Sequence, residues 1–152
     1  MSSLVWTDAH HSELTASVLH DILELRNRVF VVEQQCWYQD IDGLDLTQDT
    51  RHLFAAHNDQ LVAYARLVAP DDAGAVRIGR VIVSASLRGQ RLGQELMARA
   101  IGACASHWPG APVALAAQAH LLDFYVGLGF VAVSEPYDED GIPHVDMVLS
   151  PA

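Results

Sequence analysis

Hydrophobic residues recur along the chain with two different spacings, and the change from one to the other marks the expected helices and strands. Apolar side chains at helical spacing predict helices over residues 14–30, behind a Ser12 cap, over 92–104, and over 121–128. Runs rich in β-branched and aromatic residues predict strands over 4–6, 52–56, 61–68, 76–83, 112–117, 130–133 and 144–149.

Turn residues indicate how these strands follow one another. The stretch His57-Asn58-Asp59-Gln60 predicts a tight hairpin, and the break over 70–74 separates a third antiparallel strand. The resulting order βαβββαβαββ predicts an α+β fold with one domain spanning residues 1–152. Segment 34–50 loses periodicity and gains carboxylates, so we expect a long loop there.

Charge and composition exclude several function classes. The 152 residues are 51% hydrophobic and carry a formal net charge of −10, which disfavours nucleic acid and anionic membranes as partners. The two cysteines, Cys36 and Cys104, flank no CxxC pattern, so neither a disulfide framework nor a metal site is expected. The beginning of the chain lacks the basic-then-apolar order of a signal peptide, and no apolar run approaches membrane-spanning length, which favours a cytoplasmic location.

The segment from Arg88 to Gly93 lies between an expected buried strand and an expected helix. Unpaired amides and the helix dipole at such a point attract an anion, and glycines let the backbone approach it closely. The spacing matches neither a P-loop nor a dinucleotide fingerprint. Taken alone, these residues leave two interpretations open: a phosphate site, or a turn whose glycines only relieve crowding.

A family resemblance favours the phosphate site. VSASLRGQRLGQELM resembles the acyl-CoA-binding motif of the GNAT acetyltransferase superfamily, and FYVGLGF resembles its second signature, in the same order along the chain. FVVEQQCWYQDIDGLD, YARLV, IGRVIVS, AQAHLLDFY and EDGIPH resemble the ElaA-like branch of that superfamily, so the resemblance covers nearly the whole chain. It implies a mixed, mostly antiparallel twisted sheet flanked by helices, and acetyl-CoA as co-substrate without a metal.

The resemblance also implies a donor site. The amides of residues 88–93 would bind the pyrophosphate of CoA, and the edge of one strand, freed by its splay from a neighbour, would hydrogen-bond the pantetheine arm. Arg91 replaces the middle glycine of many members, so we expect a conformation that non-glycine residues readily adopt. The implied donor-binding residues are Val81, Ile82, Val83, Arg88, Gly89, Gln90, Arg91, Leu92 and Gly93.

Two kinds of catalytic group are expected. Tyr125 matches the tyrosine that in many members protonates the departing CoA thiolate, although without the motif it would be taken as a core residue. The strand over 77–83 holds no carboxylate, so the base must come from elsewhere. Glu33 is the first candidate, with a solvated helix-end residue as the alternative interpretation, and His52 and His144 are further candidates.

The loop EQQCWYQDIDGLD suggests the acceptor. Trp37, Asp40 and Asp42 combine an aromatic face with negative charge and no Lys or Arg in the loop, which suits a cationic amine. The alternative is a solvated surface loop with a turn at Asp42-Gly43. Together with His52 and His144, these residues form the expected acceptor side.

The expected function is therefore direct transfer of an acetyl group from acetyl-CoA to an amine, either a small molecule or a peptide. A covalent route through Cys36 is disfavoured because no basic neighbour in the sequence lowers its pKa. A non-catalytic acyl-CoA sensor or partner-binding module is the alternative. The apolar last strands are compatible with a homodimer through a shared edge.

Overall fold

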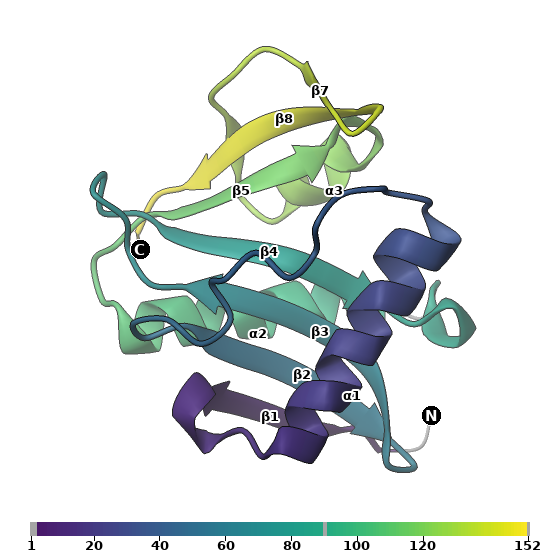
Figure 1. Cartoon of the computed structure of the whole chain (residues 1–152). Coiled ribbons are helices and arrows are strands. Elements are labelled where there is room, and N and C mark those ends of the chain that lie inside the picture. Colours follow the sequence, from purple (N-terminus) through teal and green to yellow (C-terminus); the bar gives the residue numbers. More distant parts are fainter. Residues whose placement is uncertain (1–2, 90, 152) are drawn as a thin grey trace.

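The computed structural model describes residues 3–89 and 91–151, and these residues form one twisted sheet of eight strands (Figure 1). The sheet order is β1-β2-β3-β4-β5-β8-β6, with β7 paired to β8, and every neighbouring pair except β4–β5 is antiparallel. The strands are β1 (Val5–His10), β2 (Arg51–His57), β3 (Gln60–Val68), β4 (Val76–Val83), β5 (Val113–Gln118), β6 (Val131–Ala132), β7 (Tyr137–Glu139) and β8 (Ile142–Leu149).

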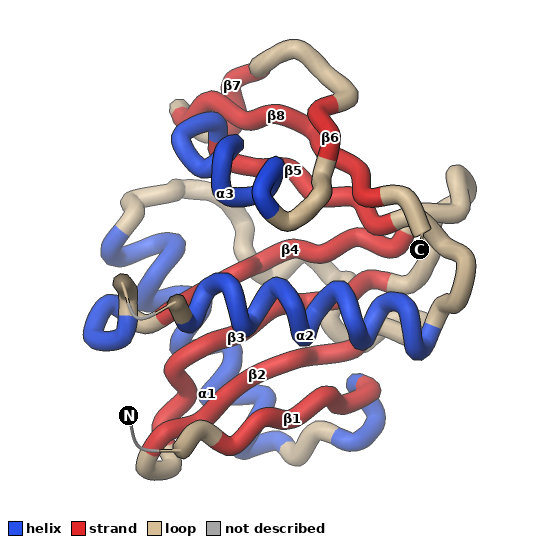
Figure 2. The backbone as a smooth tube through the Cα atoms, turned by 180° about the vertical axis from the view of Figure 1, so that it is seen from behind, coloured by secondary structure: helices blue, strands red, loops and turns tan. Residues whose placement is uncertain are grey.

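Helices cover both faces of the sheet. Helix α1 (Ala16–Arg26) crosses the front face in Figure 1, and α2 (Leu92–His107) and α3 (Leu122–Gly127) lie behind it, as Figure 2 shows. Segment 34–50 forms no strand or helix and crosses the front of the sheet beside α1. The expected mixed α+β fold and the long loop are both confirmed.

Each face has its own hydrophobic cluster. Leu96, Met97 and Ala100 of α2 are fully buried against one face of the central strands. On the other face, Ile22 and Leu25 of α1 pack against residues of β2, β3 and β4. Burying a large aliphatic side chain contributes about 1.5–3 kcal/mol, so these two layers fix α1 and α2 on opposite sides of β4.

Local sequence explains most of the element boundaries. Asn58 and Asp59 both have positive φ (52° and 63°), as a two-residue type I′ hairpin requires, and the predicted β2–β3 hairpin is confirmed. Helix α1 begins at a Thr15 cap, whose hydroxyl accepts from the Val18 amide, rather than at the predicted Ser12.

Two elements differ from the sequence prediction. The first helix does not continue unchanged to residue 30, because a π-helix (Asn27–Glu33) follows α1 and places Val29 and Phe30 in the front cluster. The stretch YDEDGIP is not a simple connection. It contains β7 and the turn into β8, which adds one short strand to the predicted order.

Candidate active site

The parallel neighbours β4 and β5 splay apart. Their pairing consists of Val76 with Val113 and Arg77 with Ala114, after which β4 continues alongside β3 and β5 alongside β8. Within the described residues, the β5-facing edge of 78–83 therefore has no strand partner. The free strand edge implied by the family resemblance is present, and it contains the predicted residues Val81, Ile82 and Val83.

A β-bulge interrupts β4 at this point. Tyr64 pairs with Ile82, but Arg66 pairs with Gly79, so Arg80 and Val81 lie opposite a single residue of β3. Arg80 has a φ of +53°, a left-handed conformation that is uncommon outside glycine.

The extra residue reverses the alternation of side chains along β4. Ile78 packs in the cluster behind the sheet, whereas Ile82, four residues later, packs in the front cluster with α1. Val81 and Val83 pack at the margin of the rear cluster. A one-residue shift has this effect because strand side chains repeat every two residues.

The turn before α2 joins the free edge to a helix N-terminus. Gly89 has a φ of +87°, and Arg91 is the N-cap of α2 with no side-chain hydrogen bond to the first turn. A Cβ atom at Gly93 would lie 3.9 Å from Phe124 and Val83, in ordinary contact, so this position has little spare space on the protein side. Leu92 is buried and anchors the turn in the rear cluster, and Gln90 lies outside the described residues.

Arg91 corrects one expectation. Its φ of +60° and ψ of 15° are left-handed, not the conformation that non-glycine residues readily adopt. Such a conformation costs an L-residue roughly 1–2 kcal/mol, which packing of the surrounding turn must offset. The middle position of the motif therefore keeps a glycine-like backbone even though arginine occupies it.

The structure brings together two predicted residues that are distant in the sequence. Arg88 donates from Nε to the Val83 carbonyl at 2.9 Å and from Nη2 to Glu33 Oε2 at 3.1 Å. Glu33 is the last residue of the π-helix, and both side chains remain partly exposed. The first candidate base is thus ion-paired with a candidate CoA ligand.

Tyr125 lies in α3, next to Phe124, whose ring lies beside Gly93 at the start of α2. Its ring packs edge-on against Phe124 and Phe130, with centroids 5.1 Å and 6.0 Å away. Burial raises the pKa of its phenol, which keeps the proton on the oxygen. Among the described residues the hydroxyl makes no hydrogen bond, so its proton is not committed to a structural partner.

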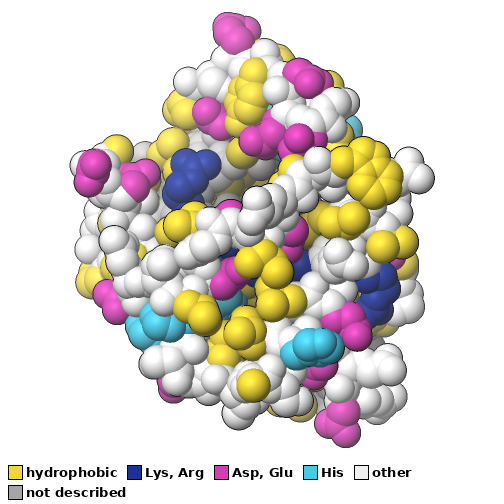
Figure 3. Space-filling model, viewed as in Figure 1, with side chains coloured by type: hydrophobic (Ala, Val, Ile, Leu, Met, Phe, Trp, Pro, Cys, Tyr) yellow, Lys and Arg dark blue, Asp and Glu magenta, His cyan; other side chains and the backbone are white. Residues whose placement is uncertain are grey.

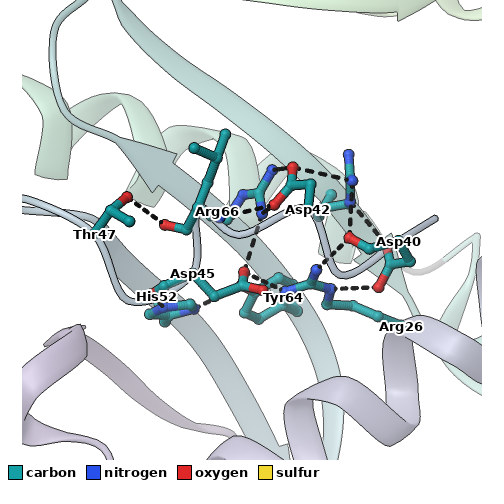
Figure 4. Close-up of polar contacts among 10 residues, drawn as sticks. Arg26, Asp40, Asp42, Asp45, Thr47, His52, Tyr64 and Arg66 are labelled. Atoms are coloured by element: carbon teal, nitrogen blue, oxygen red, sulfur yellow. Dashed lines mark hydrogen bonds and ion pairs between the residues drawn. The ribbon is translucent and has the colours of Figure 1, made fainter.

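The acidic loop contacts arginines from other elements. Asp40 accepts from Arg26 and Arg80, and the carboxylate of Asp42 accepts from Arg66 and Arg80 (Figure 4). The expectation of uncompensated negative charge was therefore wrong at Asp40 and Asp42, because guanidinium groups from α1, β3 and β4 balance it. Trp37, in contrast, is 77% exposed and presents its ring to solvent.

His52 is fully buried beneath this loop. Its Nε2 lies 2.9 Å from the Asp45 carbonyl and its Nδ1 lies 2.7 Å from the Tyr64 hydroxyl. Because a carbonyl only accepts, Nε2 carries the hydrogen and Nδ1 accepts from Tyr64. Burial lowers the pKa of this imidazole. With both nitrogens bonded inside the protein, His52 is placed as a structural group and has no access to an acceptor.

His144 is located differently, on β8 opposite Gln118 at the end of β5. Its Nδ1 donates to the Ile142 carbonyl at 2.8 Å, which leaves the lone pair on Nε2, 3.7 Å from the Glu139 carboxylate. Tyr137 stacks on the imidazole and donates to Asp146 at 2.6 Å, and this contact raises the pKa of Tyr137, already raised by burial, to about 12. Figure 3 shows acidic side chains gathered over this end of the molecule.

Sequence reasoning missed the three arginines that bind the acidic loop. The available signal was a charged residue inside an apolar strand: Arg66 in YARLV and Arg80 in IGRVIVS. A buried arginine needs carboxylate partners, and segment 34–50 was one of the segments that could supply them. Arg26 gave no such signal because it lies at the end of a helix, where a cation is ordinary.

Within residues 3–89 and 91–151, no helix is long and apolar enough to cross a membrane. The same residues contain no group of three or more His, Cys, Asp or Glu side chains placed to hold a metal ion.

Comparison with known proteins identifies the family. The family model for an acetyltransferase (GNAT) domain matches residues 14–151. The protein ElaA of Escherichia coli is 57% identical over 143 residues, which span 93% of this chain and 94% of ElaA. The crystal structure of Escherichia coli ElaA covers 97% of this chain and 100% of its own, with a TM-score of 0.94.

A crystal structure of an acyl-CoA N-acyltransferase from Pseudomonas aeruginosa is equally similar. It is 52% identical and covers 97% of this chain and 100% of its own, with a TM-score of 0.95. Sequence and fold thus agree along almost the entire length, and the chain belongs to the GNAT acetyltransferase family, within its ElaA-like branch.

Proposed function

We propose that the protein is an acetyl-CoA-dependent N-acetyltransferase that passes the acetyl group directly to an amine. The observation that carries this proposal is the free edge of β4, which leads through a glycine-containing turn into the N-terminus of α2. The free backbone groups of this edge can hydrogen-bond the amides of the pantetheine arm as a neighbouring strand would. The turn offers backbone N–H groups to the pyrophosphate. The name of the Pseudomonas aeruginosa relative, an acyl-CoA N-acyltransferase, supports the same donor.

The bulge supplies a group for the reacting carbonyl. Two residues of β4, Arg80 and Val81, lie opposite one residue of β3, and we infer that the β3 ladder leaves one of their two amides unbonded. We assign the remaining amide to the thioester oxygen, where a fixed N–H donor stabilises the charge that develops during attack. Val81 to Val83 hold the pantetheine arm, and the amides of residues 88–93 hold the pyrophosphate.

Proton movements follow from the two candidate groups. A neutral amine attacks the thioester carbon after His144 Nε2 has taken its proton, and Glu139 at 3.7 Å stabilises the resulting imidazolium. The carbon–sulfur bond then breaks and the CoA thiolate receives the phenolic proton of Tyr125. The proton that the nitrogen loses as the amide forms returns to the phenolate directly or through water, which restores the tyrosine. Glu33, the first candidate from the sequence, keeps a role beside the donor through Arg88.

The acceptor in this proposal is a primary amine, and an acceptor that carries a further positive charge elsewhere in the molecule is favoured. A cationic acceptor is attracted by the net charge of −10 and by Glu139 beside His144, whose side chain is 54% exposed. Exposed Trp37 adds an aromatic face for an alkylammonium group. Because arginines balance Asp40 and Asp42, we do not assign these two residues to direct contact with the acceptor.

A thiol-release assay tests the proposal. Purified protein is mixed with acetyl-CoA and with cationic, neutral and anionic amines of similar size, free CoA is measured with a chromogenic disulfide, and the acetylated product is identified by mass. We expect release with at least one cationic primary amine. CoA binding in calorimetry combined with no release from a broad amine panel would instead favour the non-catalytic acyl-CoA module.

A further inference from the structure

Six charged side chains on the front of the sheet form a closed ring. Each carboxylate of the ring contacts two guanidinium groups, and each guanidinium contacts two carboxylates. The members alternate in sign around the ring, which we call the Arg–Asp ring: Arg26, Asp40, Arg80, Asp42, Arg66 and Asp45. The ring is neutral overall, which suits its location between the loop and the sheet.

The ring is desolvated and geometrically constrained. The side chain of Arg26 has no exposure, and those of Arg66 and Asp45 are 5% and 8% exposed. Burial alone would raise the pKa of Asp45, but hydrogen bonds from Arg26 and Arg66 outweigh it and lower this pKa. Figure 4 shows the carboxylates pointing toward the guanidinium groups, and buried charges of this kind hold one arrangement.

One member of the ring is also the bulge residue. Arg80 donates to Asp40 Oδ1 at 2.7 Å, to the Asp40 carbonyl at 3.0 Å and to Asp42 Oδ2 at 3.3 Å. Its backbone has the left-handed φ of +53° that arginine ordinarily avoids. Three bonds from the side chain therefore act on the residue whose backbone conformation defines the bulge.

We propose that Asp40 and Arg80 are positioning residues for acetyl transfer, and that their contact holds the β4 bulge so that its free amide faces the thioester. This inference rests on the proposed function. The ring thereby connects α1 and segment 34–50, on the acceptor side, to the backbone that binds the donor. Neither side chain needs to touch a substrate for this role.

A purely structural ring would only attach the loop to the sheet. Asp45 separates these two roles because it contacts Arg26 and Arg66 but not Arg80. Asp45→Asn therefore weakens the attachment of the loop without touching the bulge. Asp40→Asn makes the same change in charge but weakens the contact with Arg80, the bulge residue.

The test compares four variants: Arg80→Ala, Arg80→Gly, Asp40→Asn and Asp45→Asn. We expect Arg80→Ala to lower kcat at least tenfold with KM for acetyl-CoA within about twofold, because the amide acts mainly on the transition state. Arg80→Gly should recover part of that loss, since glycine adopts φ +53° without strain. Asp45→Asn should lower the unfolding midpoint more than it lowers kcat.

Equal kcat losses in Arg80→Ala and Arg80→Gly would overturn the inference, as would a kcat loss in Asp45→Asn as large as that in Asp40→Asn. A second measurement needs no turnover: the backbone ¹³C shifts of residue 80 report the left-handed conformation. Asp40→Asn should move these shifts toward extended values and Asp45→Asn should not, and unchanged shifts in Asp40→Asn would also overturn the inference. Wild-type protein that releases no thiol would instead refute the proposed function, while the shifts still report whether the ring holds the bulge.

Discussion

Glu33 and Arg88, 55 positions apart in the chain, form an ion pair with a distance of 3.1 Å between Oε2 and Nη2. The same guanidinium donates from Nε to the Val83 carbonyl at the end of β4. The pair therefore spans the point where the free strand edge meets the turn before α2. If Arg88 binds a CoA phosphate, as proposed, that phosphate and Glu33 would compete for the same cation.

Glu33→Gln distinguishes a base from a partner of Arg88. As the base, Glu33 would be needed for kcat, whereas as a partner it would mainly affect the donor. We expect KM for acetyl-CoA to fall a few-fold and kcat to stay within about twofold, because an exposed ion pair contributes under ~1 kcal/mol. Initial-rate kinetics check this, and a hundredfold loss of kcat at unchanged KM would return the base role to Glu33.

Gly93 tests the donor turn. Gly93→Glu introduces bulk and negative charge at the second residue of α2, so it should weaken CoA binding at least tenfold. Gly93→Ala is the matched control, because its Cβ meets Phe124 and Val83 only at ordinary contact distance. Calorimetric titration with CoA measures both. Gly89 is a poorer test, since its φ of +87° strains any side chain. Equal CoA affinity in the two Gly93 variants would remove the turn from the donor site.

Tyr125→Phe removes one oxygen from a buried ring that packs against Phe124 and Phe130. We expect kcat to fall ten- to a thousandfold with little change in acetyl-CoA affinity, since proton donation acts only in the transition state. The loss of kcat caused by Tyr125→Phe should be smaller with an acyl donor whose thiol is more acidic, because that thiolate needs less help from a proton donor. If kcat is unchanged while chemistry limits the rate, Tyr125 is a packing residue.

Cys36→Ala addresses the covalent route. Cys36 is buried, burial and the charge of Asp140 raise the pKa of its thiol, and its polar contacts are with Gln34 at 3.9 Å. A thiol in this environment is a poor nucleophile, so the variant should keep kcat within about threefold. Mass spectrometry of wild-type protein with acetyl-CoA should show no acetyl group on this residue. An acetylated Cys36 peptide formed at the rate of turnover would establish the covalent route.

Acid should destabilise the protein in two steps. Burial lowers the pKa of His52 below its unfolded value of ~6.5, so the unfolded chain binds a proton first and the free energy of unfolding decreases as pH falls below that value. Burial alone would raise the pKa of Asp42, but the Arg66 contact outweighs it and sets this pKa at about 2. Its stabilising effect is present above the unfolded value and is lost between about pH 4 and pH 2.

Urea unfolding at a series of pH values measures both steps. His52→Gln should flatten the dependence between about pH 7 and pH 5 and leave the steeper acid limb in place. The control is His20→Gln, because His20 is exposed on α1 and outside the Arg–Asp ring. Identical pH dependence in wild-type protein and His52→Gln would contradict the assignment.

The sequence predicted the fold well where the signal was local. The two-residue hairpin at Asn58-Asp59, the amphipathic α2 and the strand runs all follow from short-range spacing, and the family resemblance indicated the turn before α2 as the candidate donor site. The bulge at Arg80 had no comparable signal, because a one-residue register shift is defined only against the partner strand. The π-helix after Arg26 was missed for a similar reason, since its apolar residues still fit helical spacing.

The candidate site shows where sequence reasoning stops. Glu33 and Arg88 were both predicted, but for different roles, and their contact depends on the tertiary fold. The carboxylates of segment 34–50 looked uncompensated because their partners, Arg66 and Arg80, are distant in sequence. The acidic character of the segment was therefore read correctly from the sequence, but its net charge in the folded protein was not.

Two residue pairs, Val76 with Val113 and Arg77 with Ala114, join β4 to β5 within the described residues. In mechanical terms the sheet consists of two plates, β1 to β4 and β5 to β8, coupled along a short seam. Bending about this seam would change the separation of β4 and β5 beyond the two pairs without breaking any ladder within either plate. Under the proposed function, the packing of Val76 and Val113 would therefore help to set how much room an acyl group has between the two unpaired strand edges.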